Sequence, residues 1–191
     1  MAAPTKHFLS YLETSIKQNA NCPALSDYDG DLTYTYAQMA EKIARLHVLF
    51  STSGLRKGDK VAICGRNSAH WAISFLAVTS YEAIAVSILP DFQPESIHAL
   101  VNHSDAKCLF VGPVVWNAID VNAMPTLGGI ISMNQFELLE SRTDKLTHAY
   151  NNWETAFNEK YPKGFSALEV TYPQNNLDEP ALINYTSGTT S

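Results

Sequence analysis

The stretch GLRKGDKVAICGRNSAHWAISFLAV, residues 54–78, decides the fold class of this 191-residue chain. Its polar turn leads into Val61–Cys64, a short apolar run that is typical of a buried strand. Ser68 then stands where a helix cap is expected, ahead of apolar residues at helical spacing. A strand, a turn and a helix in this order form the repeating unit of α/β sheets.

The flanking sequence repeats this unit in both directions. Upstream, Thr35 and Gln38 have the spacing of a capping box and predict a helix that ends at Gly54. Downstream, Pro94 suits the first turn of another helix. Three more runs lack polar alternation, as expected of strands covered on both faces: Ile84–Leu89, Cys108–Val111 and Gly129–Met133. We therefore predict a three-layer α/β/α domain with a mainly parallel sheet.

The last part of the chain is less regular. Apolar and aromatic residues at steps of three or four predict a helical stretch over Leu138–Tyr161, with its aromatic stripe in the core. This periodicity is lost over Pro162–Pro180, which we interpret as a surface connection rich in turn residues. The run Ala181–Tyr185 predicts one more strand.

The composition favours a folded domain and argues against several classes of function. The chain is 46% hydrophobic and 17% charged, unlike a disordered segment. Its net charge of -6 and its 13 scattered Lys and Arg residues provide no basic stripe for nucleic acid. Neither a secretory leader nor a transmembrane segment is indicated. Cys22, Cys64 and Cys108 fit no disulfide framework, so we expect buried thiols in a cytoplasmic protein, with peripheral membrane attachment left open.

The sequence predicts no metal site. His98 and His103 are five residues apart and would not share a helix face well, so surface or packing roles are expected. Three aspartates flank Gly30 as in a calcium loop, but no glutamate follows at the twelfth position. A tight turn explains these aspartates better.

The segment YTSGTTS, Tyr185–Ser191, is the candidate site for chemistry. Gly188 can adopt positive φ, which lets successive backbone N–H groups converge on an anion, and the hydroxyls add further donors. Such a loop after a buried strand suits phosphate oxygens. It has neither the GxxxxGK[ST] spacing of a Walker loop nor a GxGxxG fingerprint. Its composition alone would equally fit an ordinary turn rich in serine and threonine.

The order of these residues resembles the signature loop YTSGTTG of the adenylate-forming superfamily, with six of seven positions matching. This superfamily includes acyl-CoA synthetases, luciferases and peptide-synthetase adenylation domains. The segments LTYTYAQMAEKIARL and SIHALVNHSDAKCLFV and the opening stretch 54–78 are also similar to the family pattern. The tail DKLTHAYNNWETAFNEKYPKGF and the approach EPALINYTSGTTS look most like a bacterial long-chain fatty-acid CoA ligase.

The resemblance implies a role for the loop in binding ATP. The residues implied to hold the β- and γ-phosphates are Thr186, Ser187, Gly188, Thr189 and Thr190. A fatty-acid carboxylate would attack the α-phosphorus, and coenzyme A would then displace AMP, with Mg²⁺ as the metal cofactor of the full-length enzyme. Residues 1–191 are expected to hold no catalytic residue, no metal ligand and no bound cofactor. Ser191 and Glu82 depart from the pattern, since both positions are usually glycine in the family.

The resemblance also implies a domain boundary. We expect residues 1–191 to be an N-terminal subdomain fragment of an AMP-binding domain, inactive alone, with the rest of that domain and a C-terminal domain missing. Two alternatives stay open: a noncatalytic α/β interaction module of the same fold, and an adenylating enzyme with a different acid or acceptor. The oligomeric state stays open as well.

Overall fold

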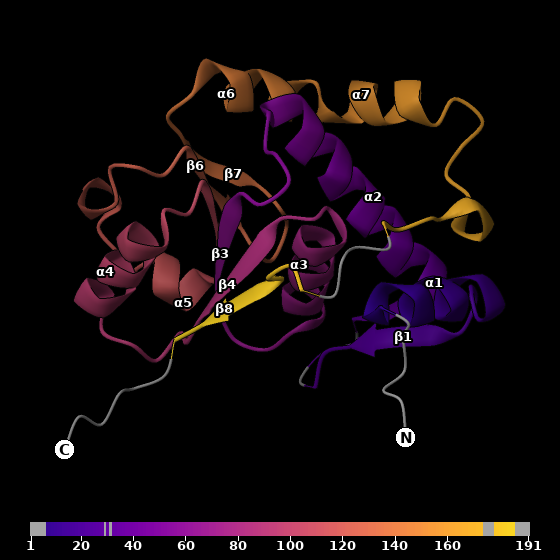
Figure 1. The fold of residues 1–191 in the computed structure, drawn as a ribbon, viewed down its shortest axis with the longest axis horizontal. Coiled ribbons are helices and arrows are strands. Elements are labelled where there is room, and N and C mark those ends of the chain that lie inside the picture. Colours follow the sequence, from indigo (N-terminus) through magenta and orange to yellow (C-terminus); the bar gives the residue numbers. More distant parts are fainter. Residues whose placement is uncertain (1–6, 29, 31, 174–177, 186–191) are drawn as a thin grey trace.

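The computed structural model describes residues 7–28, 30, 32–173 and 178–185 (Figure 1). The elements in chain order are α1 (Phe8–Gln18), β1 (Pro23–Ser26), β2 (Thr33–Thr35), α2 (Tyr36–Ser53), β3 (Lys60–Cys64), α3 (Ala69–Ser80), β4 (Ile84–Ile88), α4 (Pro94–Ser104), β5 (Cys108–Val111), α5 (Pro113–Trp116), η1 (Val121–Ala123), β6 (Gly129–Ser132), β7 (Leu138–Ser141), α6 (Asp144–Asn151), α7 (Trp153–Lys160), η2 (Ala167–Glu169) and β8 (Leu182–Asn184).

The described residues form a six-stranded sheet with the order β7-β6-β5-β3-β4-β8. Five of these strands run parallel, and β7 pairs antiparallel with β6 at one edge. In the centre, Val61 of β3 lies beside Ala85 of β4 and Cys108 of β5. Strands β1 and β2 form a separate antiparallel pair next to α1. Because the five strands are parallel, all their carboxyl ends meet at one edge of the sheet.

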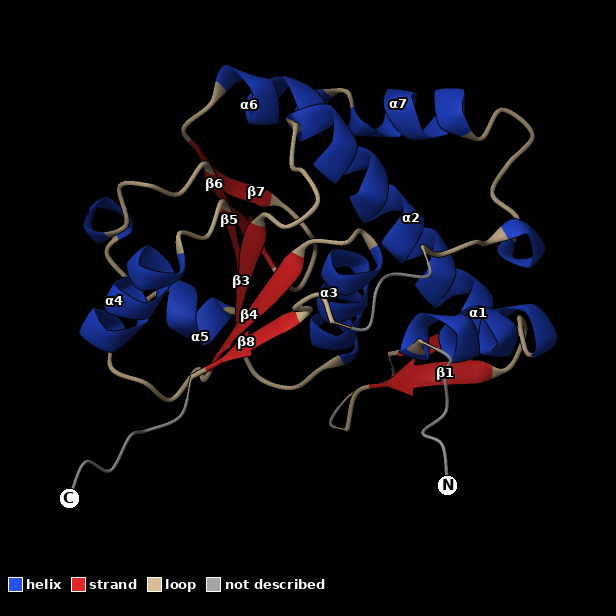
Figure 2. Ribbon diagram, viewed as in Figure 1, coloured by secondary structure: helices blue, strands red, loops and turns tan. Residues whose placement is uncertain are grey.

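Helices cover both faces of this sheet, with α2 and α3 on one side and α4 and α5 on the other (Figure 2). Alternate residues of β3 serve the two cores: Ile63 packs toward α2 and α3, whereas Ala62 and Cys64 pack toward α4. Burial on both faces explains why the strands are continuous apolar runs. The predicted three-layer α/β/α fold with a mainly parallel sheet is confirmed.

The caps predicted from the sequence are present. Thr35 Oγ1 accepts a hydrogen bond from the Gln38 N–H at 3.2 Å, and Gln38 Oε1 accepts one from the Thr35 N–H at 2.9 Å. Gly54 ends α2 with φ 84°, a left-handed conformation that favours glycine. Ser68 caps α3 by accepting a hydrogen bond from the Trp71 N–H. Each such N-cap contributes about 1 kcal/mol, which helps to set where these helices begin.

Two expectations from the sequence are wrong. Residues 138–161 do not form one helical stretch, because Leu138–Ser141 is the antiparallel strand β7 and α6 and α7 are separate helices that meet at Asn152. The chain turns back at Phe136, whose φ is 57°, so that residues 138–141 satisfy the open edge of β6. Cys22 is exposed in the turn after α1, whereas Cys64 and Cys108 are buried as expected.

Arg45 of α2 fastens α7 to the body of the domain. Its Nη1 donates to both carboxylate oxygens of Glu154, at 2.7 and 2.8 Å, and its Nε donates to Glu41 at 3.0 Å. The guanidinium lies 4.1 Å from the centre of the Phe157 ring. Trp153 Nε1 donates to the backbone carbonyl of Arg45. A planar, always charged guanidinium can make these contacts together, which a lysine cannot.

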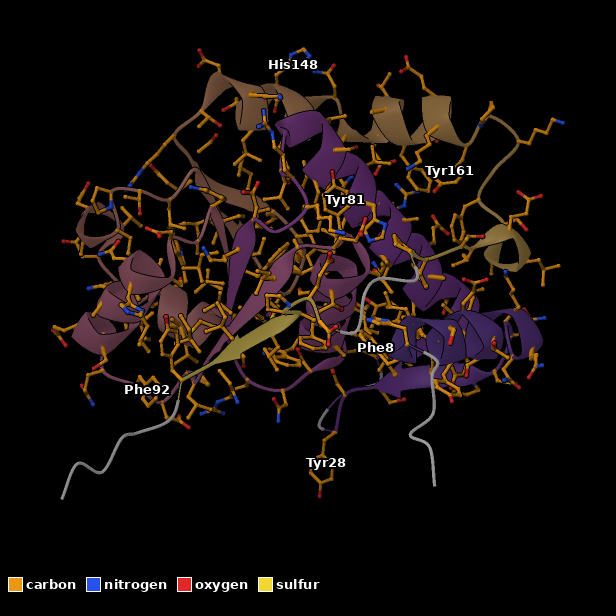
Figure 3. The ribbon with its side chains drawn as sticks, viewed as in Figure 1. Phe8, Tyr28, Tyr81, Phe92, His148 and Tyr161 are labelled. Atoms are coloured by element: carbon orange, nitrogen blue, oxygen red, sulfur yellow. The ribbon has the colours of Figure 1, made fainter. Side chains whose placement is uncertain are left out.

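His47 of α2 is held in its neutral form by burial. Its Nε2 lies 3.0 Å from the Ala77 carbonyl oxygen, which can only accept, so Nε2 carries the proton. The ring packs against Tyr81, which Figure 3 labels beside α2. Desolvation, opposed in part by the hydrogen bond to Ala77 and aided by the positive charge of Lys160, lowers the pKa of His47 from 6.5 to about 4.

We expect Arg45→Met to destabilise the protein by about 1 kcal/mol, because it removes both the ion pairs and the stacking on Phe157. Arg45→Lys should recover only part of this loss. Hydrogen exchange should accelerate in α7 and stay unchanged in β3. Lys163→Met, at an exposed position, is the matched control. Unchanged exchange in α7 would contradict this account of how the helix is held.

The low pKa of His47 predicts a pH dependence. The folded pKa lies below the unfolded value, so the contribution is constant above pH 6.5 and stability is lost as the pH falls from there toward 4. Between pH 7 and 4.5 the natural chain should lose about 2–3 kcal/mol more than His47→Gln, which cannot titrate. Urea unfolding of both proteins at the two pH values measures this difference. Equal losses would show that His47 is not the group responsible.

Candidate functional site

Strand β8 ends at the carboxyl edge of the parallel sheet, and the hydroxyl-rich segment follows it in the sequence. Strand β8 pairs with β4 through Ala85 and Leu182, Val86 and Ile183, and Ser87 and Asn184. The chain therefore leaves β8 at the edge where ligands of open α/β sheets bind (Figure 1). The predicted phosphate-binding residues Thr186, Ser187, Gly188, Thr189 and Thr190 lie outside the described residues.

Tyr185 anchors the start of this segment to α4. Its hydroxyl and His103 Nδ1 are hydrogen bonded at 2.9 Å, and the two rings meet edge to face with centroids 5.9 Å apart. Desolvation raises the pKa of Tyr185, which keeps the phenol protonated. The contact with Tyr185 is a packing role of the kind expected for His103, although the sequence gives no signal for this partner.

The approach to β8 is fastened on its other side by an ion-pair group. Lys57 Nζ lies 2.9 Å from both Glu82 Oε1 and Glu179 Oε2, and the Ala85 N–H donates to the Ala181 carbonyl at 3.0 Å. The side chains of this group are 25–53% exposed, so the pairs orient the segment more than they stabilise the fold.

The departure from the family pattern at Glu82 has a structural explanation. Glu82 has φ 64°, the left-handed conformation that would favour the usual glycine. Its carbonyl accepts a hydrogen bond from the Gly58 N–H at 2.8 Å, which holds the turn between α3 and β4. The glutamate therefore keeps the glycine-type backbone and adds a carboxylate that pairs with Lys57.

A cavity of about 130 Å³ opens at the same edge. Its walls come from the segments that follow β3, β4, β5 and β6, and Phe92, labelled in Figure 3, lies near this edge. Arg66 lines the cavity, is exposed, and makes no ion pair with another described side chain. It is a cation available to an anionic ligand. Arg66 is not predicted from the sequence, although a basic residue two positions after a buried strand is a signal that could have found it.

The helix N-termini at this edge offer few free donors to a phosphate. In the first turn of α3, the Ala69 N–H already donates to Asp27 Oδ1 at 2.6 Å, and the Trp71 N–H donates to Ser68 Oγ at 3.1 Å. Helices α4 and α5 begin with Pro94 and Pro113, which have no N–H. Among the described residues, Arg66 is therefore the clearest anion-binding group at this edge, and further donors must come from elsewhere.

Over the described ranges, no group of three or more His, Cys, Asp and Glu side chains is placed to hold a metal ion. No described helix has the length and apolar character needed to span a bilayer.

Comparison with known proteins agrees with this geometry. The fold defines an α/β protein with its ligand edge at the carboxyl ends of parallel strands. The family model described as "AMP-binding enzyme" matches residues 12–191, and the chain belongs to this family. Acetyl-coenzyme A synthetase of Photobacterium profundum is 25% identical over 174 residues, which cover 86% of this chain and 26% of that protein.

Two solved structures share the fold. The anthranilate CoA ligase AuaEII in complex with anthranoyl-AMP has a TM-score of 0.73 at 20% identity, covering 98% of this chain and 33% of that one. A long-chain-fatty-acid-CoA ligase (FadD1) from Archaeoglobus fulgidus has a TM-score of 0.70 at 17% identity. The match covers 98% of this chain and 36% of that one. The chain spans 26–34% of the length of the first curated relatives that it matches.

Tyr185→Phe should loosen the start of the hydroxyl-rich segment. It removes the hydrogen bond to His103 but keeps the ring contact, so we expect a loss of about 1 kcal/mol or less in stability. Backbone amides of Ile183 and Asn184 should exchange faster with solvent. Tyr11→Phe, at a tyrosine that is 54% exposed on α1, is the control and should change neither quantity. Unaltered exchange in β8 would mean that His103 does not hold this segment.

Proposed function

We propose that this chain is part of an ATP-dependent, AMP-forming acid–thiol ligase that activates a fatty acid and transfers it to coenzyme A. One observation carries the proposal: β8 ends at the carboxyl edge of a parallel sheet, and the sequence YTSGTTS follows it directly in the chain. Membership of the AMP-binding enzyme family supports it. The names of the relatives and structural neighbours, which include acetyl-CoA, anthranilate and long-chain fatty-acid ligases, support the reaction class.

In this proposal the segment after β8 binds phosphate and stabilises charge. Its backbone N–H groups and the hydroxyls of Thr186, Ser187, Thr189 and Thr190 hold the β- and γ-phosphates of ATP. The carboxylate oxygen of the acid attacks the α-phosphorus, the bond to the bridging oxygen breaks, and pyrophosphate leaves. Orientation of the reactants and donors directed at the developing charge supply most of the acceleration.

The second half-reaction transfers the acyl group. The thiolate sulfur of coenzyme A attacks the acyl carbonyl carbon of the adenylate, and AMP leaves with the electrons of the broken C–O bond. The thiol proton passes to solvent or to a base of the protein. We assign no residue of this chain to that step.

The acid, the metal and the domain boundary belong to the same proposal. A fatty acid is proposed from the sequence resemblance at the tail and at the approach to β8. The described residues offer no cluster of ligands for Mg²⁺, so none of them is assigned to it. We propose that residues 1–191 are the N-terminal subdomain of the AMP-binding domain and that the adenine, acyl and metal sites lie on other segments of the full-length protein.

The loop is tested by replacing Thr186, Ser187, Thr189 and Thr190 with alanine in the full-length protein. We expect acid-dependent exchange of pyrophosphate into ATP to fall about 100-fold or more, because several donors to the transferring phosphates are removed together. Thr14→Ala, at an exposed hydroxyl on α1, is the control and should leave exchange unchanged.

Three outcomes would contradict the proposal or a part of it. Exchange that survives the four substitutions would show that the loop does not bind the phosphates. Absence of exchange in the unaltered full-length protein, tried with fatty, aromatic and amino acids, would instead favour a noncatalytic module of the same fold. Exchange without thioester formation on coenzyme A would indicate a different acceptor and overturn that part of the proposal.

A further inference from the structure

A larger cavity lies at the opposite, amino edge of the sheet. It has a volume of about 440 Å³, within the range of small-molecule sites. Its wall includes Asp59 just before β3, Lys107 just before β5 and Gly128 just before β6. The carboxyl ends of these parallel strands, where ATP is proposed to bind, face the other way.

The inner wall of this amino-edge cavity is apolar. Leu49 and Phe50 come from the last turns of α2, Ile131 from β6 and Leu146 from α6, and all four are buried. Leu146 approaches the sheet closely because Gly129 lies beneath it, where any side chain would collide with the leucine. An apolar ligand body would be well desolvated against this wall.

The mouth of the cavity is positively charged. Arg56 and Lys107 line it and are exposed, and neither makes an ion pair with another described side chain. Arg56 and Lys107 lie on the same rim. The Lys107 N–H donates to the carbonyl of Lys60 at 2.8 Å, and Lys60 is the residue that follows the Arg56–Asp59 turn. The carboxylate of Asp59 is already engaged, because its Oδ2 accepts a hydrogen bond from the Arg56 N–H at 2.8 Å.

A third cation lies beside the same mouth. The Lys145 ammonium sits over Gly54, so closely that a side chain at Gly54 would collide with it. This position is the C-terminal end of α2, where the exposed backbone carbonyls favour a positive charge. Thr126 and Thr143 also line the cavity, and Thr126 is an exposed residue.

We propose that this amino-edge cavity binds a small amphipathic monocarboxylate, with its apolar body against Leu49, Phe50 and Ile131 and its carboxylate between Arg56 and Lys107. The apolar inner wall and the cationic mouth together favour a ligand that has both an apolar body and a negative charge. A neutral apolar molecule leaves the cations without a partner, and a cation is repelled at the mouth. The site is separate from the proposed ATP edge, so its failure would leave the proposed function untouched.

Phenylbutyrate is a suitable probe, with phenylbutanol and phenylbutylamine as ligands of similar size that lack the negative charge. In a titration of the isotopically labelled 191-residue chain followed by NMR, we expect phenylbutyrate to shift the amide signals of Gly54, Arg56, Lys107 and Gly128. The signals of Arg66 and Tyr185, at the carboxyl edge, should not move. The alcohol should bind about fivefold more weakly, and the amine more weakly still.

Charge variants test which residues hold the carboxylate. Arg56→Glu and Lys107→Glu should each weaken phenylbutyrate binding about threefold to tenfold, with little effect on the alcohol. If the reversed charge prevents folding, Lys107→Gln can be used instead, and it should weaken phenylbutyrate binding less than Lys107→Glu does. Lys163→Glu makes the same change of net charge at a remote exposed position and should leave binding unaltered.

Three results would overturn this inference. The first is equal binding of the acid and the alcohol, which would remove the role of the cations. The second is a shift of Arg66 or Tyr185 in place of the cavity signals, which would assign the acid to the carboxyl edge. The third is unchanged binding in the Lys107 and Arg56 variants.

Discussion

The parallel pairing of β8 with β4 is the contact on which the functional account depends. Backbone hydrogen bonds in register from Ala85 to Ser87 set the direction in which β8 runs, and this direction decides the edge at which the chain emerges. β8 has only three residues, so the pairing needs support from its surroundings. The hydrogen bond between Tyr185 and His103 of α4 supports it on one side, and the ion pair between Glu179 and Lys57 supports it on the other. These contacts on both sides hold the end of β8 at the carboxyl edge, and the predicted phosphate-binding residues follow it in the sequence.

The two edges of the sheet differ in chemistry for a physical reason. At the carboxyl edge, Asp27 and Ser68 already accept hydrogen bonds from the N-terminus of α3, so an incoming phosphate needs donors from Arg66 and, as proposed, from the glycine-containing sequence that follows β8. At the amino edge, apolar side chains of α2 and α6 line a wider cavity with cations at its mouth. The carboxyl edge would therefore suit a nucleotide, and the amino edge would suit an amphipathic acid.

Much of the fold could be predicted because local signals agree with the tertiary structure. The capping box at Thr35 and the cap at Ser68 predict where helices begin, and the continuous apolar runs predict buried strands. Each of these local signals agrees with the fold. The strand Leu138–Ser141 could not be predicted, since its state depends on the open edge of β6 and its apolar residues also fit a helical period. The partners of Tyr185 and Lys57 are distant in sequence, so only the structure reveals them. The hydroxyl-rich segment was found from residue order alone and stays a prediction.

The most direct test is hydrogen–deuterium exchange of the full-length protein with and without a non-hydrolysable ATP analogue. The account predicts that the analogue protects the peptides spanning residues 182–191 and 65–68, at the carboxyl edge, and leaves residues 54–56 and 107–108 unaffected. Protection confined to the amino edge, or none in residues 182–191 at saturating analogue, would contradict it.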